Sequence, residues 1–570
     1  MCLCAPGLPR ASESRAQTAV AAKRNEGVKT LMSLRLFGPS SGRPFYLTAS
    51  YFCASVLVWM TQGFGMNMTS VNIPQIAGAF GASISEATWL NAAYMAPNVS
   101  LSILLVKIRN QFGLRMFTVV SIVSFSAAAL LHVYVVDLRT AVILRFFAGI
   151  AAAPMSTLGM LYMMEAFPPA LKPTWAISLS LTCSTIGSTF TRLISTSLLD
   201  YGQWKALSTM ELGLALCSLA AVLALHLTPI ARENVLEVWD FVSYPLLAIG
   251  FGLIAIVLVQ GTNYWWFEVR WIGVCSAVAI ASICAALLIE LHRSRPLIDL
   301  QWLTHPIVLR FAVTLVLFRF VLSEQTAGAY GLFRSFGLLG EQSRSLYVAI
   351  IGATILGGLL CGAIMEAKRT ALLPALALAL ISSGAYVDSH STVLTRPENM
   401  YLSQALIALG GILFLPPALS AGTALAQSSG PMTMSSFVAV FLLSQNLGAL
   451  AGSAAFGSFV VVRERVHSSR LIEPVLQSNP IVAQQLDRIN NVYRGVLPDD
   501  RLRSAEAVAN VARRQSQQAT VLAYNDAFLL IALCAAGTLG ILVLGIILGY
   551  RPSRVESTTV TNDARVSSNS

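Results

Sequence analysis

Five charged side chains lie within long apolar stretches of the sequence: Arg145, Arg192, Glu211, Arg319 and Glu324. An ionised group in the middle of a lipid bilayer costs about 2.5–3.5 kcal/mol on insertion scales, so such groups usually face a cavity or a partner. Desolvation disfavours the charged form of a carboxyl group. The two glutamates are therefore candidates to bind and release a proton as their surroundings alternate between dry and wet.

Each of these charges also has a structural interpretation. Glu211 and Glu324 could instead form interhelical ion pairs with Arg192 or Arg319. Arg319 and Glu324 lie on different faces of a helix, about 140° apart, so they are not expected to pair with each other. Arg145 is expected in a central cavity, where it could hold an anionic substrate or stabilise the charged form of a nearby carboxyl group. Alternatively, it could extend from its helix end to the membrane surface.

Polar side chains in the first two apolar stretches repeat at helical spacing. Asn91, Tyr94 and Asn98 follow the i, i+3, i+7 pattern and share one helix face. Gln62 and Asn67 lie in the preceding stretch. We expect these side chains to line a path for a small molecule. The alternative is interhelical hydrogen bonding, which contributes about 0.6 kcal/mol for each bond.

Small residues recur four apart in two later stretches, which is typical of closely packed membrane helices. The pairs are Gly358 with Gly362 and Gly448 with Gly452. They predict helix packing, and their faces could also slide or rock against neighbouring helices.

The elements that carry these residues follow from composition. Of 570 residues, 55% are hydrophobic and 11% are charged, whereas soluble domains are roughly 45–50% apolar and about 25% charged. The apolar residues form continuous runs of about twenty, long enough to cross roughly 30 Å of hydrocarbon as helices. Because the runs do not alternate with polar residues, a β-barrel is excluded. The sequence predicts an all-α polytopic membrane protein.

Fourteen transmembrane helices are predicted from these runs. Their ranges are 45–68, 87–106, 114–135, 139–164, 174–198, 207–229, 241–260, 271–291, 307–330, 346–365, 370–387, 401–426, 434–460 and 523–549. They divide into a six-helix bundle over 45–229, two inserted helices within 230–300, and a second six-helix bundle over 301–549.

Basic residues fix the expected orientation, because cytoplasmic loops of membrane proteins are rich in Lys and Arg. One set of loops holds Lys107, Arg109, Arg115, Lys172, Arg232, Arg293, Arg295, Lys368, Arg369, Arg551 and Arg554. The opposite loops near 73–86, 136–138, 199–206 and 261–270 hold at most one each. Both termini are therefore expected in the cytoplasm, which requires an even number of spans. This pattern also accounts for the net charge of +11, and nucleic-acid binding is not expected because no basic face with interleaved aromatic residues occurs.

Three segments lie outside the spans. Residues 1–44 and 550–570 are expected to be cytoplasmic tails, the first of them disordered because it is polar and rich in Ser, Ala and Gly. Residues 461–522 form a hydrophilic stretch between the last two spans, on the outer side. Within this stretch, 481–495 and 504–519 have the pattern of short amphipathic helices, which could lie on the membrane or contact a partner.

The sequence gives no sign of an enzyme. It contains no nucleophile elbow, no phosphate-binding P-loop and no spacing of metal ligands, so neither a metal nor another cofactor is expected. Without a P-loop, the chain is not expected to hydrolyse ATP itself.

Several segments together resemble the major facilitator superfamily, specifically its fourteen-span drug–proton antiporters of the EmrB/QacA type. In the fourth span, residues 144–154 read Leu-Arg-Phe-Phe-Ala-Gly-Ile-Ala-Ala-Ala-Pro, which is similar to that superfamily's intramembrane arginine followed by a small-residue face at Gly149. Segments 73–81, with Thr88 and Trp89, 239–241, 295–300 and 522–528 are also similar and occur in the same order. The resemblance covers roughly residues 45–550.

This chain departs from the family pattern at three places. The family usually has an acidic residue in the first span, about ten residues before the position of Pro74, but residues 62–69 contain none. The loop at 110–115 keeps Gly113 and Arg115 and lacks the family's aspartate. The antiporter motif of span five is replaced by Gly-Ser-Thr-Phe-Thr-Arg at 187–192. The chain is therefore identified as a divergent member.

The resemblance implies export of amphipathic small molecules across the inner membrane by alternating access, driven by protons. It also implies a periplasmic adaptor protein and an outer-membrane channel as partners, with 461–522 as the candidate contact. Two alternatives remain open at the level of sequence. The missing acid in span one would suit an uncoupled or differently coupled facilitator, and a degenerate carrier fold could serve as a membrane sensor or scaffold.

Overall fold

The structure, a computed structural model, describes residues 44–229, 232–293, 295–338, 340–365, 372–472, 480–496 and 499–547. Apart from Pro44, the two tails predicted at 1–44 and 550–570 lie outside these residues, as do four basic residues used for the orientation (Lys368, Arg369, Arg551 and Arg554). All regular secondary structure in the described part of the chain is helical.

The helices follow one another along the whole described chain. The α-helices are α2 (Phe45–Val71), α3 (Ile73–Phe80), α4 (Ile84–Leu101), α5 (Leu105–Phe112), α6 (Leu114–His132), α7 (Leu138–Ala166), α8 (Ile177–Ala224), α9 (Asp240–Gln260), α10 (Arg270–Leu291), α11 (Leu300–Leu303), α12 (Pro306–Val321), α13 (Ala329–Ser335), α14 (Arg344–Ile364), α15 (Leu372–Asp388), α16 (Tyr401–Ser429), α17 (Pro431–Ile472), α18 (Pro480–Tyr493) and α19 (Asp500–Ile547). Two π-helical turns, η1 (Lys172–Ala176) and η2 (Glu324–Gly328), precede α8 and α13.

Ten of the described helices are long and apolar enough to cross a membrane. The count becomes eleven if α4 and α5, which are bent by 58° relative to each other, form one span. α15 is apolar but shorter, and neither α2 nor the first part of α8 is among the ten. The chain is therefore a multi-pass helical membrane protein.

α8 turns back on itself, although its residues are helical from Ile177 to Ala224. Its residue Ser180 accepts a hydrogen bond from Trp59 of α2 (3.0 Å), and Ser218 lies 2.6 Å from the hydroxyl oxygen of Thr61, two residues further along α2. In a straight helix, residues 180 and 218 would be roughly 57 Å apart. The two parts of α8 therefore lie side by side on α2, as the break predicted at 199–206 requires.

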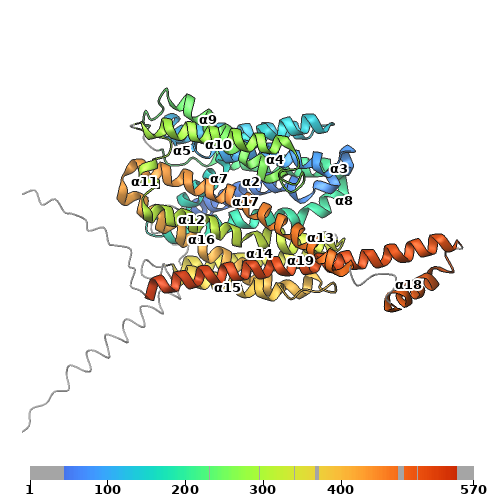
Figure 1. Cartoon of the computed structure of the whole chain (residues 1–570). Coiled ribbons are helices and arrows are strands. Elements are labelled where there is room, and N and C mark those ends of the chain that lie inside the picture. Colours follow the sequence, from blue (N-terminus) through green and yellow to red (C-terminus); the bar gives the residue numbers. More distant parts are fainter. Residues whose placement is uncertain are drawn as a thin grey trace, which may run out of the picture.

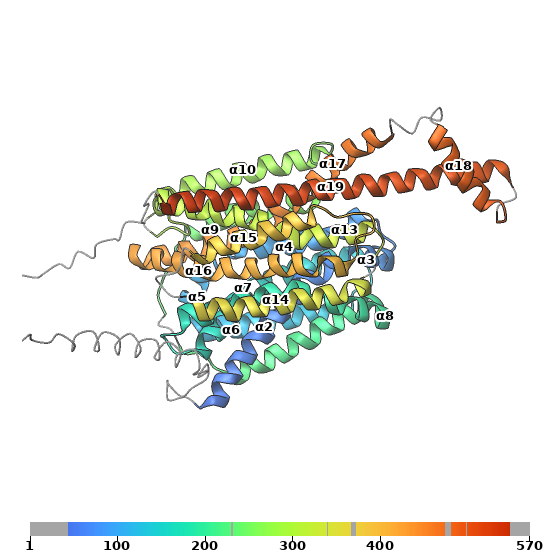
Figure 2. The same cartoon turned by 90° about the horizontal axis from the view of Figure 1, so that it is seen from below.

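The long helices run roughly parallel and give the molecule two ends. In Figure 1, α5 and α11 mark the end on the left, named here the α5 end, and α3 and α13 mark the end on the right, named the α3 end. α2 begins and α19 finishes at the α5 end (Figure 2).

α17 and α19 continue past the other helices at the α3 end, and α18 lies beside the projecting part of α19 (Figures 1 and 2). α18 matches the amphipathic helix predicted at 481–495. The separate short helix predicted at 504–519 is wrong, because these residues belong to α19. No Gly or Pro occurs from 499 to 536, so nothing in this stretch interrupts the helix.

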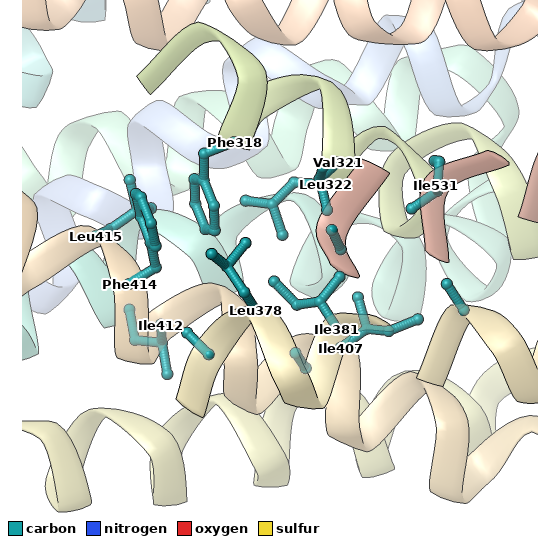
Figure 3. Packing of buried hydrophobic residues seen from close by; sticks show 14 of the residues in the cluster. Phe318, Val321, Leu322, Leu378, Ile381, Ile407, Ile412, Phe414, Leu415 and Ile531 are labelled. Carbon is teal, nitrogen blue, oxygen red and sulfur yellow. The ribbon is translucent and has the colours of Figure 1, made fainter. Parts of the chain in front are cut away.

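The helices pack as two groups around separate apolar cores. The first bundle consists of α2, α4, α6, α7 and α8, and the second consists of α12, α14, α15, α16, α17 and α19. In the second core, side chains from α12, α15, α16 and α19 interdigitate (Figure 3), and the rings of Phe318 and Phe414 stack with centroids 3.7 Å apart. α8 also contacts α14 and α16, so it joins the two bundles.

α9 and α10 pack against each other, and α9 lies on α4 of the first bundle. α10 exposes large apolar side chains, among them Val274, Val278 and Ile280. In water such a face would be a liability, whereas in a bilayer it meets lipid. Lipid is therefore the natural surrounding of these two helices.

The glycines singled out in the sequence lie where helices approach each other. A Cβ atom on Gly358 would clash with the Thr182 hydroxyl, and one on Gly362 would lie 2.8 Å from the Trp175 ring. These contacts join α14 to the start of α8 and to η1.

Gly448 and Gly452 accommodate Arg319 within the second bundle. A Cβ atom on Gly448 would lie 2.9 Å from Arg319 Cβ, and one on Gly452 would lie 3.1 Å from the Arg319 carbonyl oxygen. These two glycines let α17 approach α12 closely.

Substitution of Gly149 by alanine is expected to destabilise the first bundle. The added Cβ atom would clash with the Tyr94 carbonyl oxygen, so α7 would have to move away from α4. Overpacking of this kind costs about 1–3 kcal/mol. We expect a lower midpoint of thermal unfolding for the purified variant. Gly273→Ala on α10, whose Cβ atom would meet nothing within 4 Å, is the matched control, and equal midpoints for both variants would contradict the close approach of α4 and α7.

Candidate functional site

The first buried polar cluster lies inside the first bundle. It joins Glu211 of α8, Arg145 of α7 and His132 of α6, whose exposed fractions are 1%, 0% and 1%. Glu211 Oε2 lies 2.8 Å from His132 Nδ1, and Glu211 Oε1 lies 3.7 Å from Arg145 Nη1. The pairing of Glu211 with Arg192 or Arg319, considered from the sequence, is therefore wrong.

Arg145 is held on every side by the first bundle. Its Nη2 donates to the Gly65 carbonyl oxygen of α2 (2.8 Å), and its Cζ lies 4.4 Å from the centre of the Tyr94 ring. Since the side chain has no exposed surface, the alternative that it extends to the membrane surface is wrong.

The second buried polar cluster lies inside the second bundle. The Gln404 amide of α16 donates from one nitrogen to Glu324 Oε1 (2.7 Å) and to Asp388 Oδ2 (2.8 Å). Ser403 donates to the other oxygen of Asp388. Glu324, Asp388 and Gln404 are 0%, 2% and 1% exposed. Two carboxyl groups thus meet at one amide group, away from solvent.

This carboxyl pair differs from Glu211 in its electrostatics. Within the described residues, no ion pair involves Glu324 or Asp388, so the pairing of Glu324 with Arg192 or Arg319 is wrong as well. Like charges this close in a medium of low dielectric constant repel strongly. A single proton shared by the pair removes that repulsion, which is the arrangement known from carboxyl dyads.

A local distortion of the helix presents Glu324 to its partners. The residue opens the π-helical turn η2 between α12 and α13. Single π-turns within α-helices occur frequently at functional sites. Gly328 ends this turn, where a Cβ atom would lie 2.7 Å from the Phe528 ring of α19.

Arg192 joins the two bundles at the α3 end. It lies on the first part of α8 and donates to the carbonyl oxygens of Gln325 (3.3 Å) and Thr326 (2.7 Å) in η2. Its Cζ lies 4.6 Å from the centre of the Tyr330 ring. The acceptors directly follow Glu324, so this contact links the first bundle to the segment that carries the carboxyl pair.

The buried Nε atom of Arg319 makes no hydrogen bond within the described residues. The aliphatic part of the Arg319 side chain packs against Gly448 of α17. The structure thus separates Arg319 from both carboxyl clusters.

Gln62 and Asn67, the two polar candidates of α2, are bonded within their own helix. Asn67 donates to the Gly63 carbonyl oxygen (2.8 Å), and the Gln62 amide lies 3.8 Å from the sulfur of Met66. These contacts leave both side chains partly exposed.

The polar face of α4 points into the first bundle. Asn98 donates to the Gly149 carbonyl oxygen of α7 (3.3 Å), which is the interhelical bond considered from the sequence. Among the described residues, neither the buried Asn91 Oδ1 nor the buried Tyr94 hydroxyl has a hydrogen-bond partner. Tyr94 contributes its ring to Arg145.

Sequence reasoning missed His132, Asp388 and Gln404. His132 falls near the end of the predicted span 114–135, Asp388 directly after 370–387, and Gln404 in the first turn of 401–426. Polar residues at span ends normally meet water or lipid head groups. Their burial depends on neighbouring helices, and the only local signal was that each lies within a few residues of an apolar run.

The sequence model of the Major Facilitator Superfamily matches residues 55–453. The chain is 26% identical over 249 residues to the multidrug export protein EmrB of Escherichia coli K12, which covers 43% of this chain and 48% of that protein. It is 22% identical over 257 residues to the fatty acid resistance protein FarB of Neisseria gonorrhoeae, covering 43% of this chain and 50% of that protein. The chain spans about half the length of the curated relatives that it matches.

Solved structures share the fold. The human organic anion transporter MFSD10 (TETRAN) aligns with a TM-score of 0.51 and 10% identity over 86% of this chain and 99% of that chain. A bacterial homologue of the human drug peptide transporters PepT1 and PepT2 aligns with a TM-score of 0.53 and 12% identity over 88% and 99%. Together with the match over 55–453, the two helical bundles and the buried charges between their helices, these findings show that the chain belongs to the major facilitator superfamily of membrane transporters, which are not enzymes.

Proposed function

We propose that this protein is a proton-driven exporter of amphipathic small molecules in the bacterial inner membrane. The observation that carries the proposal is the buried pair of Glu324 and Asp388, which share the Gln404 amide. Such a pair can hold one proton in dry surroundings and release it when water enters. Glu211 is a weaker candidate for the proton, because the guanidinium group of Arg145 lies beside it and offsets its charge.

Alternating access is the mechanism that this arrangement supports, since superfamily members of this architecture move their halves about a central site. At the α3 end the bundles are joined by Arg192 and by the Tyr330 hydroxyl, which donates to the Val71 carbonyl oxygen (2.8 Å). Opening of this end requires these bonds to break. Because Arg192 binds the turn that begins at Glu324, such opening would also change the surroundings of the carboxyl pair.

Fourteen spans remain the topology that we propose. We add α2, the first part of α8 and α15 to the eleven candidate spans, which gives fourteen. This division gives six spans in each bundle and assigns α9 and α10 as the two inserted spans. An even number also agrees with α2 beginning and α19 finishing at one end (Figure 2).

The α5 end is assigned to the cytoplasm. Lys107 there bonds Asp240 and the Arg295 carbonyl oxygen, and Arg293 also binds Asp240. Basic residues gather on the cytoplasmic side of membrane proteins. Both termini would then be cytoplasmic, and α18 with the adjoining parts of α17 and α19 would project into the periplasm, where they could contact an adaptor protein that leads to an outer-membrane channel.

Transport by purified protein in liposomes tests the proposal. We expect a panel of amphipathic dyes to accumulate inside vesicles with an acidic lumen, because proton exit drives antiport, and accumulation to stop when nigericin and K⁺ dissipate the pH gradient. Protein-free liposomes measure passive dye entry. Flux that persists without the gradient would favour the facilitator, and the absence of flux for every dye would favour the sensor or scaffold.

A further inference from the structure

A cavity of about 260 Å³ lies between the two bundles at the α3 end. One wall comes from Val71 of α2, from α3 and from the first part of α8, and the other comes from α13 and α14. The α8 side chains are Arg192, Ser195 and Thr196. Because both bundles form its walls, the size of the cavity must change whenever the bundles move relative to each other.

The charge of the cavity is positive. Arg192 and Arg334 line it, and none of the described residues around it carries a carboxyl group. Two like charges in a hollow with low-dielectric walls focus the field and concentrate counter-ions. A bound anion would offset this charge.

Several donors in the cavity have no protein partner. Ser195 is 0% exposed, and its hydroxyl group makes no hydrogen bond within the described residues. The buried Nε of Arg192 and the buried hydroxyl oxygen of Thr196 also make no hydrogen bond within the described residues. Buried polar groups are almost always paired. Three unpaired donors on two turns of one helix therefore point to a ligand with acceptor atoms.

Aromatic side chains supply an apolar surface beside these donors. Tyr330, Phe333 and Tyr347 line the wall formed by α13 and α14. The face of Tyr330 is already covered by Arg192, so a cationic ligand would meet two guanidinium groups and no free ring at this residue. The cavity thus disfavours cations and suits a flat or branched apolar body that carries an anionic head.

We propose that this cavity binds the carboxylate of an amphipathic organic anion. This assignment rests on the proposed function, because the anion is a transported substrate. A carboxylate accepts two parallel hydrogen bonds from one guanidinium group. It would thereby compete with the Gln325 and Thr326 carbonyl oxygens for Arg192. Binding of the anion would loosen the contact that closes the α3 end and release the turn that carries Glu324.

Calorimetric titration of the full-length protein in phosphatidylcholine nanodiscs tests the site. The probes are 2-naphthoate, the neutral 2-naphthylmethanol and the cationic 2-naphthylmethylammonium, which share one apolar body. We expect the anion to bind at least about ten-fold more tightly than the alcohol, and Arg192→Gln and Arg334→Gln each to weaken its binding by about ten-fold. Equal affinities for the three probes would overturn the proposal.

Two further variants separate binding from folding. Ser195→Ala leaves the arginine contacts in place and is expected to weaken naphthoate binding by about three-fold through one lost donor. Arg139→Gln removes an exposed arginine at the start of α7, outside the cavity, and is expected to change nothing. If Arg192→Gln and Ser195→Ala both bind naphthoate as the wild type does, the site is wrong.

The result is independent of the transport assay. Anion-selective binding that Arg192→Gln weakens, combined with no flux in liposomes, would refute the exporter and retain the site. Gradient-driven flux of neutral or cationic dyes, combined with no preference for naphthoate, would refute the site and retain the exporter.

Discussion

Glu324→Gln is expected to reduce pH-gradient-driven transport to the level of protein-free liposomes. Glutamine keeps the shape of the side chain and an oxygen that accepts from the Gln404 amide. It cannot bind or release a proton, so the shared proton of the carboxyl pair is lost. Exchange of labelled for unlabelled substrate needs no net proton movement, and we expect it to continue in this variant.

Comparison among acidic residues makes this expectation specific. Asp388→Asn should lose gradient-driven transport in the same way, because the same pair is disrupted. Glu341→Gln, an exposed acid at the α3 end, is the matched control and should transport normally. If Glu324→Gln and Glu211→Gln both pump normally, neither glutamate carries the proton. If only Glu211→Gln fails, the proton site lies in the first bundle.

The sequence identified the buried charges because their signal is local. A charged residue inside an apolar run is costly wherever the run lies in the membrane, so Glu324, Glu211 and Arg145 stood out without any knowledge of their neighbours. Their partners could not be identified in this way. Asp388 and Gln404 reach Glu324 from α15 and α16, and the order in which helices pack is not written in any single span.

The same contrast holds for the fold. Apolar runs predicted most spans, and the clustered basic residues predicted a common end for Lys107 and Arg293, which both bind Asp240. The sequence predicts a separate short helix at 504–519, because the hydrophilic composition of these residues does not continue the apolar run of the last span, whereas α19 is continuous through them. Helix propensity acts whether or not a segment lies in lipid, and this segment contains no residue that would end a helix.

Glu211 shows how packing can offset a departure in the sequence. The first span lacks the acid that the resemblance leads one to expect. In the structure, a Cβ atom on Gly65 of α2 would lie 2.9 Å from Glu211 Oε1. The carboxylate of α8 thus occupies the space beside α2 where an acid of the first span would lie, and it meets Arg145 there. Arg145 is thus paired with a carboxylate from α8 and not with one from the first span.

Arg145→Met is therefore expected to destabilise the protein strongly, by about 3–5 kcal/mol, because it leaves Glu211 buried with only His132 as a partner. Glu211→Gln alone should also destabilise, since it leaves the guanidinium group unpaired. The double variant Arg145→Met, Glu211→Gln removes both the guanidinium and the carboxylate group, so its loss should be smaller than the sum of the two single losses. Free energies of unfolding from denaturant titration in detergent give the interaction energy as a double-mutant cycle. Strictly additive losses would show that Arg145 and Glu211 do not stabilise each other.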